Sequence, residues 1–211
     1  TSTTQGNTNT QGGAIKVSAT QSLNLTNANL NAGATNGTGG QIEFAAHQLQ
    51  ISDSNINADG DTQGGRIQLS ATASQPNNPF HDPLNLPTLP ATLAATGFTS
   101  ISSRGRRGQG GNVTLTGDDI TLDGNTNINV SGATGGGNVL VGGDWQGSSN
   151  LPQATRVNMA NSASIDASAT DNGNGGKVVL WSDVRNADSV TSALGSIKAT
   201  SGVNGGDGGQ V

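Results

Sequence analysis

The feature that recurs along this chain is a pair of glycines followed by a short segment in which apolar and polar residues alternate. Complete copies begin at Gly12, Gly39, Gly64, Gly110, Gly136 and Gly175. Copies with nothing inserted between them lie 25–27 residues apart. Alternation with a period of two indicates a strand, and a fixed repeat of this length is typical of a solenoid, in which each repeat buries its apolar face against its neighbours. The sequence therefore predicts a coil of stacked strands.

Two further motifs keep step with the glycine motif and supply the other strands of each turn. One reads small residue, Asn or Ser, Ile or Leu, polar residue, Ala, and its clearest copies are residues 28–32, 54–58, 126–130 and 163–167. The other is a short apolar–polar–apolar segment at residues 23–25, 49–51, 120–122 and 157–159. Three strands per turn and about six turns predict an all-β, three-sided parallel β-helix over residues 1–211. A seventh copy breaks off at Val211, so we expect these residues to be one segment of a longer array.

The paired glycines are expected to serve the backbone of a tight corner. Glycine adopts positive φ at little cost, whereas a β-branched residue avoids that conformation, and we expect the pairs to use it. After each corner, Ile15, Ile42 and Ile67 are predicted to stack in one interior column. A slip of one residue would turn this apolar set outward, so the register is expected to be strict.

The composition favours a narrow coil over a disordered chain or a thick globular core. Of the 211 residues, 33 are glycine, 31% are hydrophobic and only 2% are aromatic. Low hydrophobicity alone is typical of disorder, but a disordered chain shows no repeated alternation. The formal net charge of −5 argues against a nucleic-acid groove, which needs a basic surface. The sequence has no cysteine for a disulfide, no apolar run of the roughly 18 residues that span a membrane, and no signal peptide at its start.

Irregular spacing between the motifs locates the insertions. From the second glycine to the Ile or Leu of the same turn, the interval is 16 or 17 residues in three turns but 36, 28 and 21 residues in the others. The extra residues fall just after the first strand, in a proline-rich insertion at residues 72–95, a second insertion at residues 142–155 and a shorter one around residues 183–189. Proline cannot join an interior ladder, so these segments are predicted to be loops that leave one edge of the coil. Such loops commonly form the interaction face of a repeat protein.

Residues 136–211 closely resemble a repeated block of secreted filamentous-haemagglutinin-type proteins, the large exoproteins of two-partner secretion systems, in a form common in cyanobacteria. The resemblance rests on the phrases GGDWQG at 142–147, ASIDAS at 163–168, GNGGKVVLWSD at 173–183 and GGDGG at 205–209. Family membership implies a right-handed β-helix, export through a dedicated outer-membrane pore, and a role in adhesion or surface fibres. The N-terminal half fits the same architecture through its periodicity, and the family's N-terminal secretion domain is not recognisable in the sequence.

Seven side chains are candidates for contact with a partner or a surface glycan. Rare aromatic residues on a polar scaffold often stack on sugars or touch a partner, and clustered arginines attract acidic glycans or lipid headgroups. The candidates are Trp145, Trp181, Arg104, Arg106, Arg107, Phe80 and His81. Two alternatives stay open: the aromatic rings cover the small cores of their own loops, and the arginines form a solvated corner.

The residues that carry chemistry favour a structural protein over an enzyme. A carbohydrate-active β-helix enzyme, a polysaccharide lyase or hydrolase, is the alternative function, and it needs carboxylates that converge on one outer face. Glu43 is the only glutamate in the chain, and we expect no catalytic residue, no metal site and no cofactor. Structural calcium is the remaining alternative, because several carboxylates lie in or near glycine-rich corners; we expect them instead to be solvated turn residues. These are Asp59, Asp61, Asp118, Asp119 and Asp207.

These observations together predict a non-catalytic structural or adhesive stalk. We expect it to belong to a secreted or cell-surface protein associated with the outer membrane and to present its loops to other cells or to glycans. The expected partners are copies of the chain or neighbouring repeats, stacked end to end into fibres. Nucleic acid is not among the expected partners, because the chain is acidic.

Overall fold

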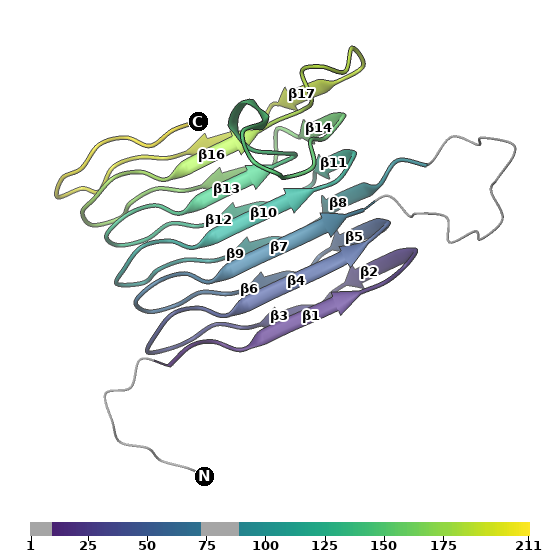
Figure 1. Ribbon diagram of the computed structural model, residues 1–211. Helices are drawn as coiled ribbons and strands as arrows, with labels where there is room; N and C mark the ends of the chain where they lie inside the picture. The colour runs from purple at the N-terminus through teal and green to yellow at the C-terminus, as the bar shows by residue number, and fades with distance from the viewer. Residues whose placement is uncertain (1–9, 73–88) are drawn as a thin grey trace, which may run out of the picture.

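The chain winds as a parallel β-helix in which each turn contributes one strand to each of three sheets. The computed structural model describes residues 10–72 and 89–211. In this part of the chain, each of the three sheets has six strands, and paired strands are parallel (Figure 1). The predicted three strands per turn and about six turns are therefore confirmed.

Each sheet collects the strands that occupy equivalent places in successive turns. The first sheet contains β1 (Ala14–Ser18), β4 (Gln41–Ala46), β7 (Arg66–Ala71), β10 (Asn112–Thr116), β13 (Asn138–Val141) and β16 (Lys177–Leu180). The second sheet contains β2 (Ser22–Thr26), β5 (Gln48–Ser52), β8 (Thr92–Thr96), β11 (Asp119–Leu122), β14 (Arg156–Met159) and β17 (Val190–Ala193). The third sheet contains β3 (Asn29–Asn31), β6 (Asn55–Asn57), β9 (Ser100–Ser102), β12 (Asn127–Asn129), β15 (Ser164–Asp166) and β18 (Ser196–Lys198).

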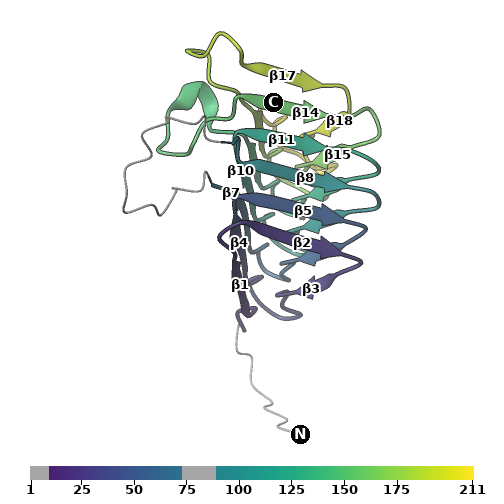
Figure 2. The same cartoon turned by 90° about the vertical axis from the view of Figure 1, so that its right-hand side faces the viewer.

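The coil is right-handed. In Figure 1 the first sheet faces the viewer, its strands run to the right, and successive turns rise from β1 to β16. Figure 2, seen from the right-hand side, shows the strands of the second sheet running away from the first sheet. A chain that turns in this direction as it rises traces a right-handed coil, the hand that crossovers between parallel strands take almost without exception.

The register builds the interior from columns of similar side chains. Ile15 pairs with Ile42, and Ile42 pairs with Ile67, as predicted. Phe44 is the largest fully buried side chain, and Leu115 in the same sheet is also 0% exposed. One apolar side chain at every second position fills so narrow an interior, which explains how a chain with 31% hydrophobic residues forms a core.

The paired glycines do not adopt the positive φ that was expected of them. Positive φ occurs at other residues, and close approach of neighbouring backbone is what requires glycine here. A Cβ on Gly40 would overlap the carbonyl oxygen of Gly13 in the preceding turn, and one on Gly39 would overlap that of Ala58. The Gly40 N–H also donates to the carbonyl oxygen of Ala32 at 2.8 Å, which ties the end of the third sheet to the start of the first.

Positive φ occurs at the corner between the second and third sheets. Asn27, Asp53, Gly97 and Gly124 occupy this corner in successive turns, with φ of 52°, 49°, 64° and 61°. Asparagine, aspartate and glycine are the residues that tolerate this conformation best. Positive φ also occurs at the edge between the third and first sheets, at Gly173, Gly205 and Gly206, but there too it falls on residues outside the glycine pairs.

The insertions leave the coil at the edge between the first and second sheets, as predicted. They lie between β7 and β8, between β13 and β14, and between β16 and β17. The proline-rich insertion is shorter than the predicted 72–95, because residues 92–95 belong to β8, where Leu93 and Ala95 are 1% and 0% exposed. The second insertion, 142–155, ends where β14 begins. Residues 73–88, which include Phe80 and His81, lie outside the described part of the chain.

The seventh glycine copy begins a further turn. Gln210 forms a parallel bridge with Lys177, and its N–H donates to the carbonyl oxygen of Gly176 at 2.9 Å. Over residues 10–72 and 89–211, there is no helix long and apolar enough to cross a membrane.

Candidate functional site

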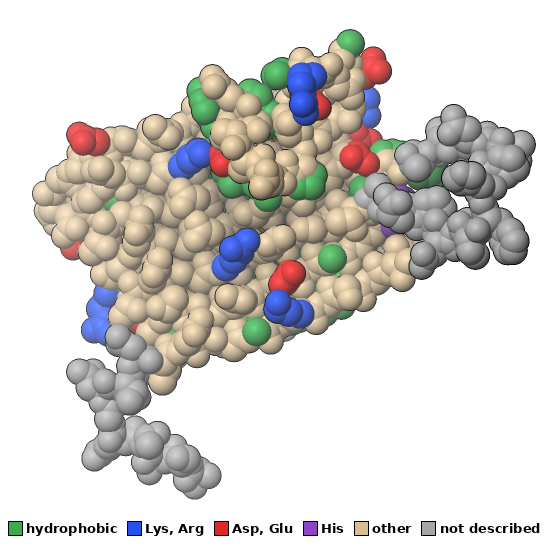
Figure 3. Space-filling view, in the orientation of Figure 1, with side chains coloured by type: hydrophobic (Ala, Val, Ile, Leu, Met, Phe, Trp, Pro, Cys, Tyr) green, Lys and Arg blue, Asp and Glu red, His purple; other side chains and the backbone are tan. Residues whose placement is uncertain are grey.

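The second insertion lies against the outer face of the first sheet. It includes one turn of 3-10 helix, η1 (Trp145–Gly147), which Figure 1 shows in front of the last strands of that sheet. Thr114 and Val179 alternate with inward-facing residues and point outward, yet they are only 9% and 6% exposed. Figure 3 shows hydrophobic side chains gathered around the loop on this face. The loop is therefore packed on the coil.

Trp145 of this loop lies against Trp181, which follows β16, as their places on a common edge predicted. Their ring centroids are 6.3 Å apart, and the ring planes are tilted by 49°. The Trp181 Nε1–H donates to Oε1 of Gln153, a residue of the same loop, at 2.9 Å. Trp181 is partly buried, whereas Trp145 is 54% exposed. Trp181 thus holds the loop on the sheet, and Trp145 presents much of its ring to solvent.

An ion pair fixes the start of η1. The Lys177 Nζ lies 2.6 Å from Asp144 Oδ1, and the same oxygen accepts the Trp145 N–H at 2.7 Å. The hydrogen bond from Lys177, followed by the one from the Trp145 backbone, holds the pKa of Asp144 below its ordinary value, because both stabilise the charged carboxylate. The charge of Lys177 is therefore balanced within the loop.

A space of about 560 Å³ beside Trp145 is bordered by Gly209, Gln210 and Val211, the residues that begin the further turn over β16. Its walls combine Trp145 and Val179 with the polar side chains of Ser148, Lys177 and Gln210. Because the next strand of the first sheet would continue into this space, the feature that suits a ligand is the exposed ring of Trp145, whose face could stack on a sugar ring. The second insertion is thus suited to binding by stacking on Trp145.

The arginine cluster contacts aspartates of the preceding turn. Arg104 reaches Asp59 Oδ2 with Nη2 at 2.7 Å and Nε at 3.0 Å. Arg107 pairs with Asp61, whose hydrogen bond and charge raise the pKa of Arg107. Arg106 is exposed and forms none of the ion pairs found among the described residues. Two of the three guanidinium groups thus form ion pairs with aspartates of the neighbouring turn.

Asp59 and Asp61 at this corner are not solvated turn residues, although the sequence led us to expect that of them. Asp59 is 1% exposed and Asp61 is 7% exposed, and each faces an arginine. Of the other calcium candidates, Asp118 accepts the Ala91 N–H at 2.8 Å, Asp119 pairs with Arg156, and Asp207 is exposed. Across the described ranges, no three His, Cys, Asp or Glu side chains are close enough to hold a metal ion.

Glu43 lies on the outer face of the first sheet and pairs with Lys16 of the preceding turn. Their Oε2 and Nζ atoms are 2.8 Å apart, and the hydrogen bond from Lys16 lowers the pKa of Glu43. A lowered pKa keeps the carboxylate ionised, whereas a general acid needs a raised one. The environment of Glu43 therefore favours a structural ion pair.

Sequence reasoning singled out the tryptophans and arginines but missed their partners. Gln153 lies in no motif, and the GGDWQG phrase that contains Asp144 does not show its partner, because both contacts follow from how the loop folds back on β16. The pairing of Arg104 with Asp59 was accessible from the repeat, since both residues lie two positions past the end of a third-sheet strand. Aligning the turns residue by residue would have placed them in successive turns.

Comparisons with known proteins give a fold relationship. No protein-family model and no curated protein matches the chain. Among solved structures, the chain is similar to the crystal structure of the HMW1 secretion domain from Haemophilus influenzae, with a TM-score of 0.60 and 18% sequence identity. The similarity covers 94% of this chain and 64% of that one, so the chain spans just under two thirds of the length of that domain. The chain is thus a parallel β-helix similar in fold to a secretion domain.

Proposed function

We propose that the chain is a non-catalytic stalk segment of a secreted or cell-surface adhesin of the filamentous-haemagglutinin type. The observation that carries this proposal is a continuous coil of three parallel sheets whose insertions depart from one edge. Such a coil is stiff along its axis, because every interior strand pairs with the turns before and after it. The coil would hold the loops on its edge away from the surface to which the protein is attached.

The fold relationship supports an extracellular location, because the similar structure is a secretion domain. The chain also has no cysteine, so it forms no disulfide that would hinder export of an unfolded chain. The proposed place of action is therefore outside the cell or at the cell surface.

Stacking end to end would lengthen the stalk. In the described part of the chain, the edge strands of the second sheet are β2 and β17, and those of the third sheet are β3 and β18. Leu23 and Leu25 at one end, and Ile197 at the other, are only partly buried. Edge strands and open apolar columns favour further strands of the same kind, so neighbouring repeats or other copies of the chain are the proposed partners.

Within this function, the second insertion is the proposed contact site for a glycan. Trp145 would supply the stacking surface, and Trp181 would hold the loop that carries it. Because Lys177 is paired with Asp144, a neutral sugar suits the site better than an acidic one. Arg106 at the glycine corner is a second candidate contact, and Phe80 and His81 remain sequence predictions.

Binding of the purified chain to immobilised neutral, uronate-containing and sulfated polysaccharides tests this contact. We expect Trp145→Ala to weaken binding by about five- to tenfold, because it removes the stacking surface. Phe98→Ala is the control, because Phe98 is 76% exposed on another corner of the coil. If no polysaccharide is bound, or if folded Trp145→Ala binds as the native chain does, the contact role is wrong.

A further inference from the structure

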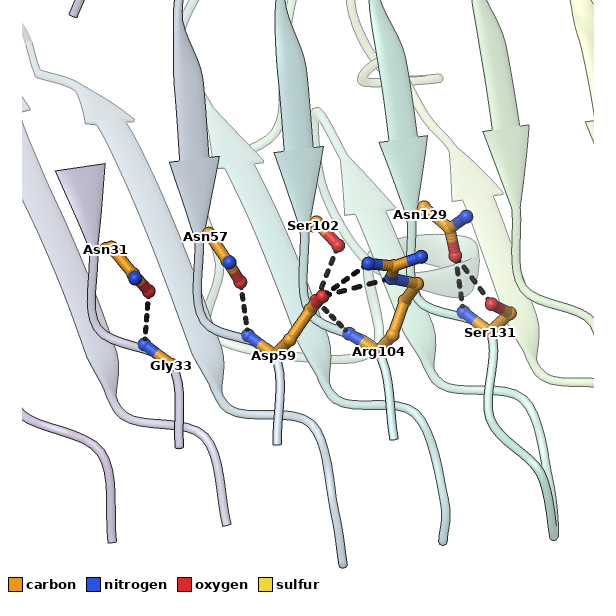
Figure 4. Close-up of polar contacts among 8 residues, drawn as sticks. All are labelled: Asn31, Gly33, Asn57, Asp59, Ser102, Arg104, Asn129 and Ser131. Atoms are coloured by element: carbon orange, nitrogen blue, oxygen red, sulfur yellow. Dashed lines mark hydrogen bonds and ion pairs between the residues drawn. The ribbon is translucent and has the colours of Figure 1, made fainter. Parts of the chain in front are cut away.

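Most turns of this coil share a cap where the third-sheet strand ends. In four turns the last residue of the strand is Asn or Asp, and its side-chain oxygen accepts the backbone N–H two residues later. The pairs are Asn31 with Gly33 at 2.9 Å, Asn57 with Asp59 at 2.7 Å, Asn129 with Ser131 at 2.9 Å and Asp166 with Ser168 at 2.9 Å. Such side-chain-to-backbone bonds turn the chain out of a strand. Figure 4 shows the caps of Asn31, Asn57 and Asn129, with the turn of Ser102 and Arg104 between the last two.

Two turns end in residues that do not provide this cap. β9 ends at Ser102, whose hydroxyl instead donates to Asp59 Oδ1 at 2.5 Å. β18 ends at Lys198, and a lysine side chain has no acceptor. In these two turns, the backbone N–H groups two residues past the end of the strand belong to Arg104 and Thr200, and the strand's last side chain does not satisfy them.

In both of these turns, the preceding turn supplies the acceptor. The Arg104 N–H donates to Asp59 Oδ1 at 2.8 Å, and the Thr200 N–H donates to Ser168 Oγ at 3.2 Å. Asp59 and Ser168 occupy the same position, two residues past the end of their own strands. The same solution therefore appears at two places in the coil, once with a carboxylate and once with a hydroxyl.

The carboxylate version also needs a balancing charge, because Asp59 is only 1% exposed. Arg104 provides it through Nε at 3.0 Å and Nη2 at 2.7 Å from Oδ2 (Figure 4). One oxygen of Asp59 thus caps the backbone of Arg104, and the other pairs with the side chain of the same residue. Hydrogen bonds between charged groups are stronger than those between neutral groups, so the two bonds to Oδ2 hold the side chain of Arg104 against Asp59.

We propose that Asp59 and Ser168 are inter-turn caps, positioning residues that fix the corner of the following turn when that turn cannot cap itself. The dependence runs one way along the chain, from the turn of β6 to the turn of β9 and from the turn of β15 to the turn of β18. The turn of β9 is also the one that carries the proline-rich insertion, so Asp59 secures the most interrupted turn of the coil. This inference does not depend on the proposed function.

Hydrogen exchange at the Arg104 amide in the full chain measures the cap directly. We expect Asp59→Ala to speed this exchange roughly tenfold or more, because the N–H loses its acceptor. Adding Ser102→Asn should bring the rate back to within about threefold of native, because the amide restores a cap within the turn and the lost carboxylate leaves room for it. Asp59→Asn, which keeps an acceptor oxygen and loses the charge, should have a smaller effect than Asp59→Ala.

A matched control lies at the same corner. Asp61→Ala removes the ion pair with Arg107 but no cap. Adding Ser102→Asn should therefore not reverse any change in amide exchange that Asp61→Ala causes. The second cap gives an independent test: Ser168→Ala should speed exchange at the Thr200 amide, and Lys198→Asn should reverse that change.

The proposal is overturned if Arg104 exchange is unchanged in Asp59→Ala, or if Ser102→Asn fails to slow it in that background. Should Asp59→Ala not fold, the double variant Asp59→Ala with Ser102→Asn decides the matter. Recovery of the folded state supports the inter-turn cap, and failure to recover contradicts it.

Discussion

Single glycines determine how closely the turns of this coil stack. The second glycine of each pair lies against the second glycine of the preceding turn, so that a Cβ on Gly176 would overlap the carbonyl oxygen of Gly137. The same holds for Gly40 above Gly13, whereas an ideal Cβ on Gly13 meets no atom of the described residues within 4 Å.

Alanine substitutions at Gly40 and Gly13 of this 211-residue chain should therefore change the free energy of unfolding by very different amounts. We expect Gly40→Ala to lower the free energy of unfolding by about 3 kcal/mol or more, because neighbouring backbone cannot move away without breaking the ladder. Gly13→Ala should change it by less than about 0.5 kcal/mol. Urea denaturation of both variants measures the difference. Equal effects would show that the corner requires glycine for a reason other than close approach.

Asp144 should make the second insertion sensitive to acid. Its pKa is lower in the folded chain than in the unfolded chain, so its stabilising contribution is complete above about pH 4 and is lost as the pH falls through the lower folded value. Tryptophan fluorescence between pH 6 and pH 2 should report the release of the loop, and Asp144→Asn should remove this transition.

Asp183 provides the control for that titration. Its pKa is also lowered, in this case by the hydrogen bond from Arg185, outside the second insertion. Asp183→Asn should leave the fluorescence transition in place. A transition that persists unchanged in Asp144→Asn would contradict the assignment to the Asp144–Lys177 pair.

The strands could be predicted wherever their two inward positions hold large aliphatic residues. β17 was missed because its inward positions hold Thr191 and Ala193, which give no apolar alternation. β8 was missed because Ala95 is small and prolines crowd the residues just before Leu93. In both cases, the neighbouring turn dictates the strand, since the ladder extends over residues whose own sequence is weak.

The assignment of β8 can be tested by comparing two leucines that the sequence places in one insertion. Leu93 is 1% exposed and Leu89 is 70% exposed. We expect Leu93→Ala to cost about 3 kcal/mol of unfolding free energy, because it leaves a cavity in the interior column. Leu89→Ala should cost less than about 0.5 kcal/mol. Similar small effects at both positions would show that residues 92–95 belong to the insertion and not to β8.

The contact loop was only partly accessible from the sequence. Trp145 and Trp181 stood out because aromatic residues are 2% of the chain, and their common edge followed from the repeat. Their different exposure did not, because it depends on the hydrogen bond between Trp181 and Gln153 and on the path of the loop over β13 and β16. A single insertion packs against residues distant in the sequence and does not recur from turn to turn, so no periodic pattern in the sequence predicts its contacts.

Metal removal tests the whole coil for structural calcium. The buried carboxylates Asp59 and Asp61 are already neutralised by arginines, so we expect the melting temperature to be the same with a chelator and with millimolar calcium. A rise of more than a few degrees with calcium would show a stabilising metal site and would overturn this expectation.

Electron microscopy of the native material, with the mass of the intact chain, tests the proposed stalk most directly. Stacked turns rise by about 4.8 Å each, so six turns span only about 30 Å, and a stalk must be extended by further turns or by further copies. We predict straight rods many times this length, formed either by one long chain or by copies stacked end to end. Discrete particles no longer than a single coil would contradict the account.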